Sequence, residues 1–323
     1  MDNRILLALI AVVGVPAVMV GYIALVEALV GRLPDKWQGK VRPWFWLAPA
    51  LLLLGFYLVY PAVNTIGLSF FDKSGAKFVG LENYRYFFTS PDTLTSLRNN
   101  ALWLVLLAGV VVILGLLFAV LFDRVKYESA AKATVFLPMA ISFVAAGVIW
   151  KLMYDYQPPG MPQTGTLNGL VALFGGQPQP WLINLSVNNF ALIAIGVWMW
   201  TGFALVILSA GLKSIPNEII EAARVDGATE WQILRSIIVP MLGSTIAVVA
   251  TTMIINALKA FDIVYVMTNG NYSTDVMANR MYKEMFNFQQ FGRASAIATV
   301  LLLAIVPVML FNIRQFRAQE AIR

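Results

Sequence analysis

Long apolar stretches recur along the whole chain, separated by polar or glycine- and proline-rich segments. A membrane-spanning helix needs about 20 consecutive, mostly apolar residues, because the bilayer core is about 30 Å thick and a helix rises about 1.5 Å per residue. The stretches that are long enough are residues 5–30, 44–71, 101–122, 133–154, 190–212, 242–267 and 294–313. The pattern predicts an all-α polytopic membrane protein with about seven transmembrane helices.

The composition agrees with a membrane protein. Hydrophobic residues make up 59% of the chain and charged residues 12%, whereas a soluble domain has about a quarter of charged residues. The sequence contains neither cysteine nor histidine. These are the common ligands of haem, iron–sulfur, zinc and copper centres, so their absence argues against a redox or metalloenzyme subunit. We expect no cofactor and no metal in this chain.

Lysine and arginine are distributed unevenly among the segments between the apolar stretches. The denser group comprises residues 31–42, 123–132, 213–241 and the C-terminal tail. The sparser group comprises residues 72–100, 155–189 and 268–293. Because basic residues favour the cytoplasmic side, this bias predicts an N-terminus outside and a C-terminus in the cytoplasm. The net charge of +6 then reflects topology and not nucleic-acid binding.

The first apolar stretch, residues 5–30, could be a signal peptide or a retained helix. A signal peptide has an apolar region of about 7–15 residues and a small-residue cleavage site. This stretch is longer, Arg4 is the only basic residue before it, and no such site precedes the basic segment. We predict a retained helix that is an appendage to one membrane domain.

A charged segment, residues 216–240, interrupts the apolar pattern. We expect Asn217 to cap a short helix that runs from Glu218 to about Asp226. Gly227 would end this helix, since glycine readily adopts the left-handed conformation found after helix C-termini.

A second short helix follows in the same segment. Thr229 and Gln232 have the spacing of a capping box. An apolar stripe then indicates a helix that lies in the membrane interface. The stripe consists of Trp231, Leu234, Ile237, Ile238 and Met241.

The charged segment allows three interpretations: a solvated connector, a DNA-binding helix-turn-helix, or a docking surface for a partner. Acidic residues outnumber basic ones over residues 217–235, and this is the wrong sign for phosphate contact. The residues concerned are Glu218, Glu221, Asp226 and Glu230 against Arg224 and Arg235. A connector and a docking surface stay open on the residues alone.

The stretch "EAARVDGA" closely resembles the EAA motif of permease subunits of bacterial ABC importers, E-A-A-x-x-D-G-A followed by an apolar helix and a proline. The matching residues are Glu221, Ala222, Ala223, Asp226, Gly227, Ala228 and Pro240. In that family the loop is a coupling helix that sits in a cleft of the ATPase subunit. The resemblance therefore favours docking.

The likeness extends over about residues 44–315 and is closest to carbohydrate importers. "FVGLENYRYFF", "LRNNALW" and "AFDIVYVMTNGNYSTD" are similar to maltose-type permeases, and the stretch that begins "FLPMAISFVAAGVIW" is similar to α-glucoside permeases, which also have an extra first helix. One departure stands after the apolar run, where the family has T-x-G-G-P and this chain has "TNGNY" at residues 268–272.

The resemblance implies a six-helix permease core over residues 43–323, with the coupling loop at 213–241, and an extra helix and cytoplasmic linker over residues 1–42. It also implies an inner-membrane complex with a second permease chain, two ATPase subunits that bind ATP and Mg²⁺, and an external solute-binding protein. The expected substrate is an α-glucoside or disaccharide of the maltose, trehalose, sucrose or glucosylglycerol class.

Polar and aromatic residues within the apolar stretches are candidates for sugar contact, because polar groups at membrane depth are costly. Stretch 242–267 offers Asn256, Lys259, Asp262 and Tyr265. Lys259 and Asp262, three residues apart, could instead pair with each other. Stretch 190–212 offers Trp198, Trp200 and Thr201, for which helix packing is the alternative.

The chain contains no G-x-x-x-x-G-K-[ST] motif, so ATP hydrolysis would belong to partner chains and we expect no catalytic residue here. Two other classes compete with the importer subunit. A secondary sugar transporter would need no coupling helix, and it usually has ionisable groups or broken helices near the membrane midplane. A structural subunit of another membrane complex, such as a redox complex, would need a cofactor in a partner chain.

Overall fold

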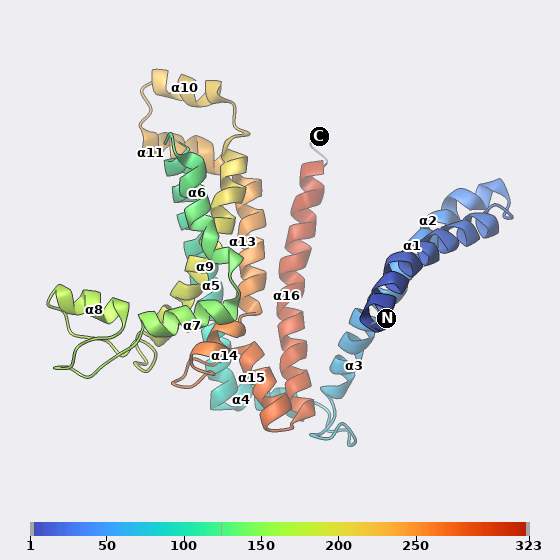
Figure 1. Cartoon of the computed structure of the whole chain (residues 1–323), viewed down its shortest axis with the longest axis horizontal. Coiled ribbons are helices and arrows are strands. Elements are labelled where there is room, and N and C mark those ends of the chain that lie inside the picture. The colour runs from blue at the N-terminus through green and yellow to red at the C-terminus, as the bar shows by residue number, and fades with distance from the viewer. Residues whose placement is uncertain (1–2, 124, 321–323) are drawn as a thin grey trace. The chain divides into compact units, whose positions relative to one another are not determined.

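The computed structural model of the chain describes residues 3–123 and 125–320, and these residues form helices joined by turns and loops (Figure 1). Contacts divide the chain into two units, Met1–Thr65 and Ile66–Arg323. The predicted division at residue 42, which rests on the family resemblance, stays a prediction.

The first unit is a hairpin of two long helices. α1 (Asn3–Val30) packs against α2 (Asp35–Leu54), which continues through a π-helical turn, η1 (Gly55–Val59), into α3 (Tyr60–Leu68). Glu27 links the two arms, because it accepts a hydrogen bond from Trp46 Nε1 at 3.1 Å and pairs with Arg42 at 3.1 Å. The predicted linker at 31–42 is mostly helical, since α2 begins at Asp35 directly after Pro34, whose fixed φ suits a helix start.

The second unit is built on four long helices: α5 (Pro91–Phe122), α9 (Asn188–Leu212), α13 (Gly243–Leu258) and α16 (Phe291–Glu320). α5 packs along α9, and α13 packs against both α5 and α16. Gly115 allows the closest approach of α5 to α9, because a Cβ there would lie 2.5 Å from Ala204 Cβ. The core between these helices contains Trp103, Leu107, Val111, Leu192, Ile195 and Leu205.

Two of the predicted spans are bent. In stretch 133–154, α6 (Glu128–Phe136) and η2 (Leu137–Ala140) meet α7 (Phe143–Met153) at an angle of 101°. Pro138 lies just before the bend, and Ser142 caps α7 by accepting a hydrogen bond from Ala145 N. The proline and the cap favour a new helix start here, which accounts for the bend.

Stretch 242–267 is also not one straight helix. α11 (Glu230–Ile233), η3 (Leu234–Ile238) and α12 (Val239–Met241) precede the stretch and meet its first helix, α13, at 74°. Within the stretch, the chain breaks between α13 and α14 (Asp262–Met267). Among the described residues, five helices are long and apolar enough to cross a membrane, or up to seven if each bent pair is one span. The all-α, multi-helix prediction is confirmed.

Short helices occupy the segments between the long ones. They are α4 (Glu82–Thr89), α8 (Thr166–Leu173), α10 (Asn217–Val225), α15 (Met277–Tyr282) and the π-helical η4 (Lys283–Asn287). Within the second unit, α10 lies at one end, and α4, α14 and α15 lie at the other (Figure 1).

Candidate coupling surface and substrate cavity

The helix α10, together with the turn that follows it, carries the predicted docking residues and projects from the end of the second unit (Figure 1). Its start differs from the prediction. Pro216, with φ of −57°, occupies the N-cap position, and Asn217 is already helical and makes no side-chain cap. Proline is suited to this place because its ring fixes φ and it needs no amide partner.

The end of α10 agrees with the prediction. Gly227 has φ of +84°, and its amide donates to the carbonyl of Arg224 at 3.1 Å. The next amide, of Ala228, donates to the carbonyl of Ala223 at 3.0 Å. These two bonds form a Schellman motif, which satisfies carbonyls that a helix end leaves free.

The helix that follows begins with the predicted capping box. The Thr229 side chain accepts from Gln232 N at 3.3 Å, and the Gln232 side chain accepts from Thr229 N at 2.8 Å. The turn between the two helices is therefore fixed on both sides. An ion pair of Arg224 with Glu230, at 2.9 Å, also joins the two helices.

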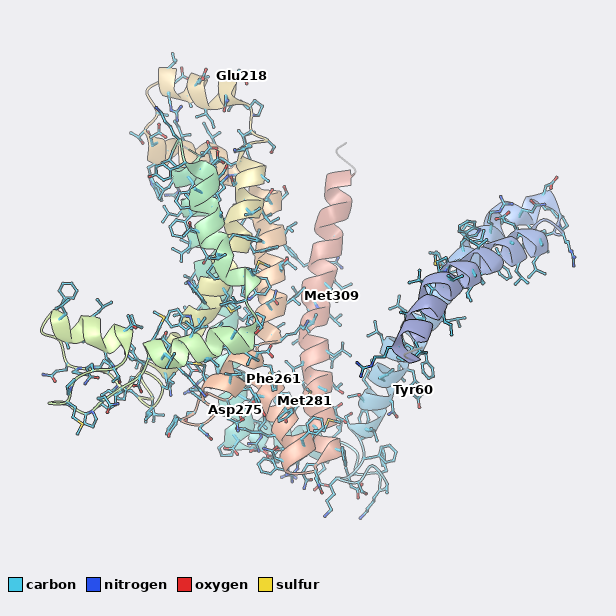
Figure 2. The ribbon with its side chains drawn as sticks, in the orientation of Figure 1. Tyr60, Glu218, Phe261, Asp275, Met281 and Met309 are labelled. Carbon is cyan, nitrogen blue, oxygen red and sulfur yellow. The ribbon has the colours of Figure 1, made fainter. Side chains whose placement is uncertain are left out.

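One side of α10 packs against the rest of the second unit, and the opposite side is exposed. Ile220, Ala223 and Ala228 contact a buried cluster below the helix, which consists of Leu212, Ile215, Ile233, Ile238 and Leu242. Glu218, labelled in Figure 2, is exposed. The other exposed residues of this region include Glu221, Ala222, Val225, Asp226 and Gly227. Val225 is 88% exposed, although it is apolar.

The structure separates the predicted sugar residues into two cavities. Asn256, Lys259, Asp262 and Trp200 line a cavity of about 180 Å³ at the break between α13 and α14. Its wall is completed by Trp103, Leu107, Phe143, Gly196, Ala260, Phe261 and Ile263. Polar groups at a helix break surrounded by aromatic side chains are a suitable place for a polar ligand with an apolar face.

Trp198 and Thr201 instead line a larger, apolar cavity of about 620 Å³ between α5, α6 and α9. Thr201 donates to the carbonyl of Val197 at 2.6 Å, so its hydroxyl proton is used within its own helix. Trp198 packs on Trp150 with ring centroids 5.6 Å apart. These contacts match the helix-packing alternative.

Asn256, Lys259 and Asp262 offer polar groups to a ligand in the smaller cavity. Asn256 donates to the carbonyl of Thr252 at 2.9 Å and makes no other hydrogen bond with the part of the chain that the structure describes. Within residues 3–123 and 125–320, no ion pair joins Lys259 to Asp262. Tyr265 lies outside the cavity wall and stacks on Phe261, which is part of that wall.

Asn100 positions this cavity and was missed by the sequence reasoning. Its side chain, 2% exposed, donates to the carbonyls of Ala257 at 3.2 Å and Leu258 at 3.4 Å. It also accepts from the amide of Met277 at 2.7 Å. Asn100 thereby satisfies the carbonyls at the end of α13, where Asn256 and Lys259 lie. The paired asparagines in "LRNNALW" were the available signal.

The unusual turn "TNGNY" is held by neighbouring asparagines. Asn99 donates to the carbonyls of Ser273 and Asp275, at 2.7 and 2.8 Å, and Asn188 donates to that of Tyr272 at 2.7 Å. The turn needs this support because several of its residues have positive φ, which is strained outside glycine. They are Asn269, Gly270, Tyr272 and Ser273.

A charged cluster continues from this turn at the same end of the unit. Asp275, labelled in Figure 2, accepts from Asn279 at 2.6 Å and from Lys283 at 3.3 Å. Burial raises the pKa of the Asp275 carboxyl, and these two partners act in the opposite direction. Arg280 pairs with Glu284 at 2.7 Å and with Asp92 at 2.9 Å, which ties α15 to η4 and to α5.

Comparison with known proteins agrees with these features. Residues 111–319 match the family described as "Binding-protein-dependent transport system inner membrane component". The "Osmoprotective compounds uptake permease protein GgtC" of Synechocystis sp. is 57% identical over 278 residues, which cover 86% of this chain and all of that protein. The "Alpha-glucoside transport system permease protein AglF" of Rhizobium meliloti is 49% identical, over 85% of this chain and 82% of that protein.

A solved structure shows the same fold. A chain of "a bacterial ABC transporter involved in the import of the acidic polysaccharide alginate" aligns with a TM-score of 0.72 and 21% identity, over 88% of this chain and 99% of that one. The resemblance to sugar-importer permeases is thereby confirmed. A match of this extent, with curated relatives at 57% and 49% identity, shows that the chain is a permease subunit and belongs to the family of inner-membrane components of binding-protein-dependent transport systems.

Proposed function

We propose that the chain forms one half of the membrane pathway of an ATP-driven importer for an α-glucoside or glucosylglycerol-type solute. The observation that carries the proposal is α10, a short helix with defined ends on which the acidic side chains of Glu218 and Glu221 are exposed. The names of the two relatives, which refer to osmoprotective compounds and to α-glucosides, support the substrate class.

The complex would contain a second permease chain, two ATPase subunits that bind ATP and Mg²⁺, and an external solute-binding protein. The N-terminus would lie outside and the C-terminus in the cytoplasm. α10 would then face the ATPase, and the end of the unit with α4 and α15 would face the binding protein. A solved structure with the same fold, the "bacterial alginate ABC transporter in complex with alginate pentasaccharide-bound periplasmic protein", with a TM-score of 0.70, supports an external binding protein as a partner.

Each part of the chain would have a definite task in transport. Glu221 and Asp226 would meet basic residues of the ATPase, where charge-assisted contacts are stronger than exposed pairs because they are partly desolvated. Asn256, Lys259 and Asp262 would bind sugar hydroxyls, and Trp200 would offer an aromatic face. Closure of the ATPases would move α10 and open the cavity toward the outside.

Co-purification tests the docking role directly. Glu221→Lys should detach or uncouple the ATPase from the tagged permease, because it places a cation against a basic partner. Asp35→Lys is a matched control, since Asp35 is also exposed and the charge change is the same. If Glu221→Lys binds the ATPase and transports labelled α-glucoside at the parental rate, Glu221 has no docking role.

A further inference from the structure

Four aromatic side chains form a continuous run at the end of the second unit that lies opposite α10. The Phe261 and Tyr265 rings are stacked, with centroids 5.2 Å apart and an interplanar angle of 21°. Tyr282 contacts both, at 5.5 and 5.3 Å, and Phe286 contacts Tyr282 at 4.9 Å. Figure 2 shows Phe261, together with Met281, at the far end of the unit from Glu218.

The run leads from the surface to the smaller cavity. Phe286 is 63% exposed and Tyr265 is 39% exposed, whereas Phe261 is part of the cavity wall. The four rings come from the break before α14, from α14 itself, from α15 and from η4. Phe261 and Tyr282 are half-buried and Tyr265 and Phe286 are exposed, so the run presents ring surface to whatever lies against this end of the unit: lipid, a partner chain or a ligand.

The chemistry beside the run favours a sugar over a lipid chain. Lys259 and Asp262 are exposed next to Phe261, and no ion pair joins them within the described parts of the chain. A charged side chain that faces hydrocarbon costs about 2.5–3.5 kcal/mol on insertion scales, so such residues line water-filled paths instead. A path that combines aromatic rings, tyrosine hydroxyls and charged groups matches a pyranose ring, which has an apolar C–H face and a rim of hydroxyls.

We propose that Phe261, Tyr265, Tyr282 and Phe286 form an entry path on which the pyranose ring of the transported glycoside makes successive stacking contacts before it reaches the cavity at Lys259 and Asp262. This path rests on the proposed function. It adds a contact surface outside the cavity, and it assigns a sugar contact to Tyr282 and Phe286, which were not among the candidates from the sequence.

Site-directed photo-crosslinking in the complete complex tests the path. A photoreactive phenylalanine analogue replaces Phe286 in one variant and Phe174 in the control, since Phe174 is 86% exposed but directly follows α8, away from the run. Reconstituted complexes are illuminated during uptake of a radiolabelled α-glucoside. We expect labelled sugar on the Phe286 variant, competed by unlabelled glucoside, and none on the Phe174 variant.

The alternatives give different products in the same experiment. If the analogue at position 286 crosslinks only to lipid, or only to the second permease, the entry path is wrong. The proposed function would still stand in that case, provided that the parental complex takes up the α-glucoside. If the parental complex takes up no α-glucoside, both the proposed function and the path are wrong.

Ring removal gives a second, independent measurement. Tyr282→Leu should lower the glucoside uptake rate roughly three- to tenfold, the range expected for the loss of one aromatic contact. Tyr282→Phe keeps the ring and should stay close to the parental rate. Both variants should retain the ATPase on purification, and equal rates for the two variants would contradict a stacking role.

Discussion

Gly227→Val should uncouple this permease from its ATPase through the backbone alone. Gly227 has φ of +84°, and a Cβ built on it meets no atom within 4 Å. A side chain at this position therefore collides with nothing, and the substitution acts only on the conformation that ends α10. A non-glycine residue in the left-handed region costs about 1–2 kcal/mol, and a β-branched residue is the least tolerant.

The size of the expected effect on the end of α10 can be worked out from the two hydrogen bonds that depend on this conformation of Gly227. They run from Gly227 N to Arg224 O, at 3.1 Å, and from Ala228 N to Ala223 O, at 3.0 Å. A cost of about 1–2 kcal/mol reduces the population of this helix end by a factor of roughly 5–30. Because Ala223 and Ala228 also anchor α10 to its buried cluster, the orientation of Glu221 should become heterogeneous.

A matched substitution isolates this cause. Gly227→Asn adds a side chain of comparable size, but asparagine visits the left-handed conformation much more readily than valine does. We expect stimulation of ATPase activity by loaded binding protein to fall strongly in the valine variant and to stay largely intact in the asparagine variant. Equal losses in both variants would show that any side chain blocks docking, and equal retention would show that the Schellman end is unimportant for coupling.

Three further predictions concern the cavity and the topology. Asn256→Ala should lower uptake of the preferred sugar with the complex intact, and unchanged uptake kinetics would return Asn256 to a packing role. Asn100→Leu leaves the Leu258 carbonyl and the Met277 amide without the partner that Asn100 provides, each worth about 1–3 kcal/mol, so the thermal unfolding midpoint of the purified complex should fall well below that of the exposed control Asn287→Leu; equal midpoints would contradict the anchoring role. Single cysteines at Lys36 and Gln177, in a chain without native cysteine, should react with impermeant reagents from opposite sides of the membrane, and labelling from one side would refute the proposed topology.

The charged segment at residues 216–240 was largely predictable because its structure is local. A capping box links residues three apart, and a Schellman motif links residues three and five apart, so the sequence of the segment contains all the partners. Thr229 with Gln232, and Gly227, behave accordingly. The error at Asn217 is also local, since two helix-start signals stood side by side and the proline took the cap position.

The cavity could be predicted only in part because it depends on residues far apart in the chain. Asn100 contacts Ala257 and Met277, which are 157 and 177 residues away, and no periodicity reports such a pairing. Trp198 and Trp200 looked equivalent in the sequence. Residues two apart on a helix are separated by about 200° of rotation around its axis. Trp198 and Trp200 therefore face different cavities.

The helix α9 joins the two candidate sites within one rigid element. Trp200 lines the smaller cavity, and Lys213, which follows the last turn of α9, begins the segment that leads to α10. Lys213 pairs with Glu128 at 2.7 Å, and Lys132 contacts both Glu128 and Ser209, so the start of α6 is tied to the end of α9. Farther along, Gly202 brings α9 against α6 so closely that a Cβ would lie 2.5 Å from Phe136 Cα. We therefore expect a displacement of α10 to be passed to α9 and α6 together and, through α9, to the aromatic wall of the cavity.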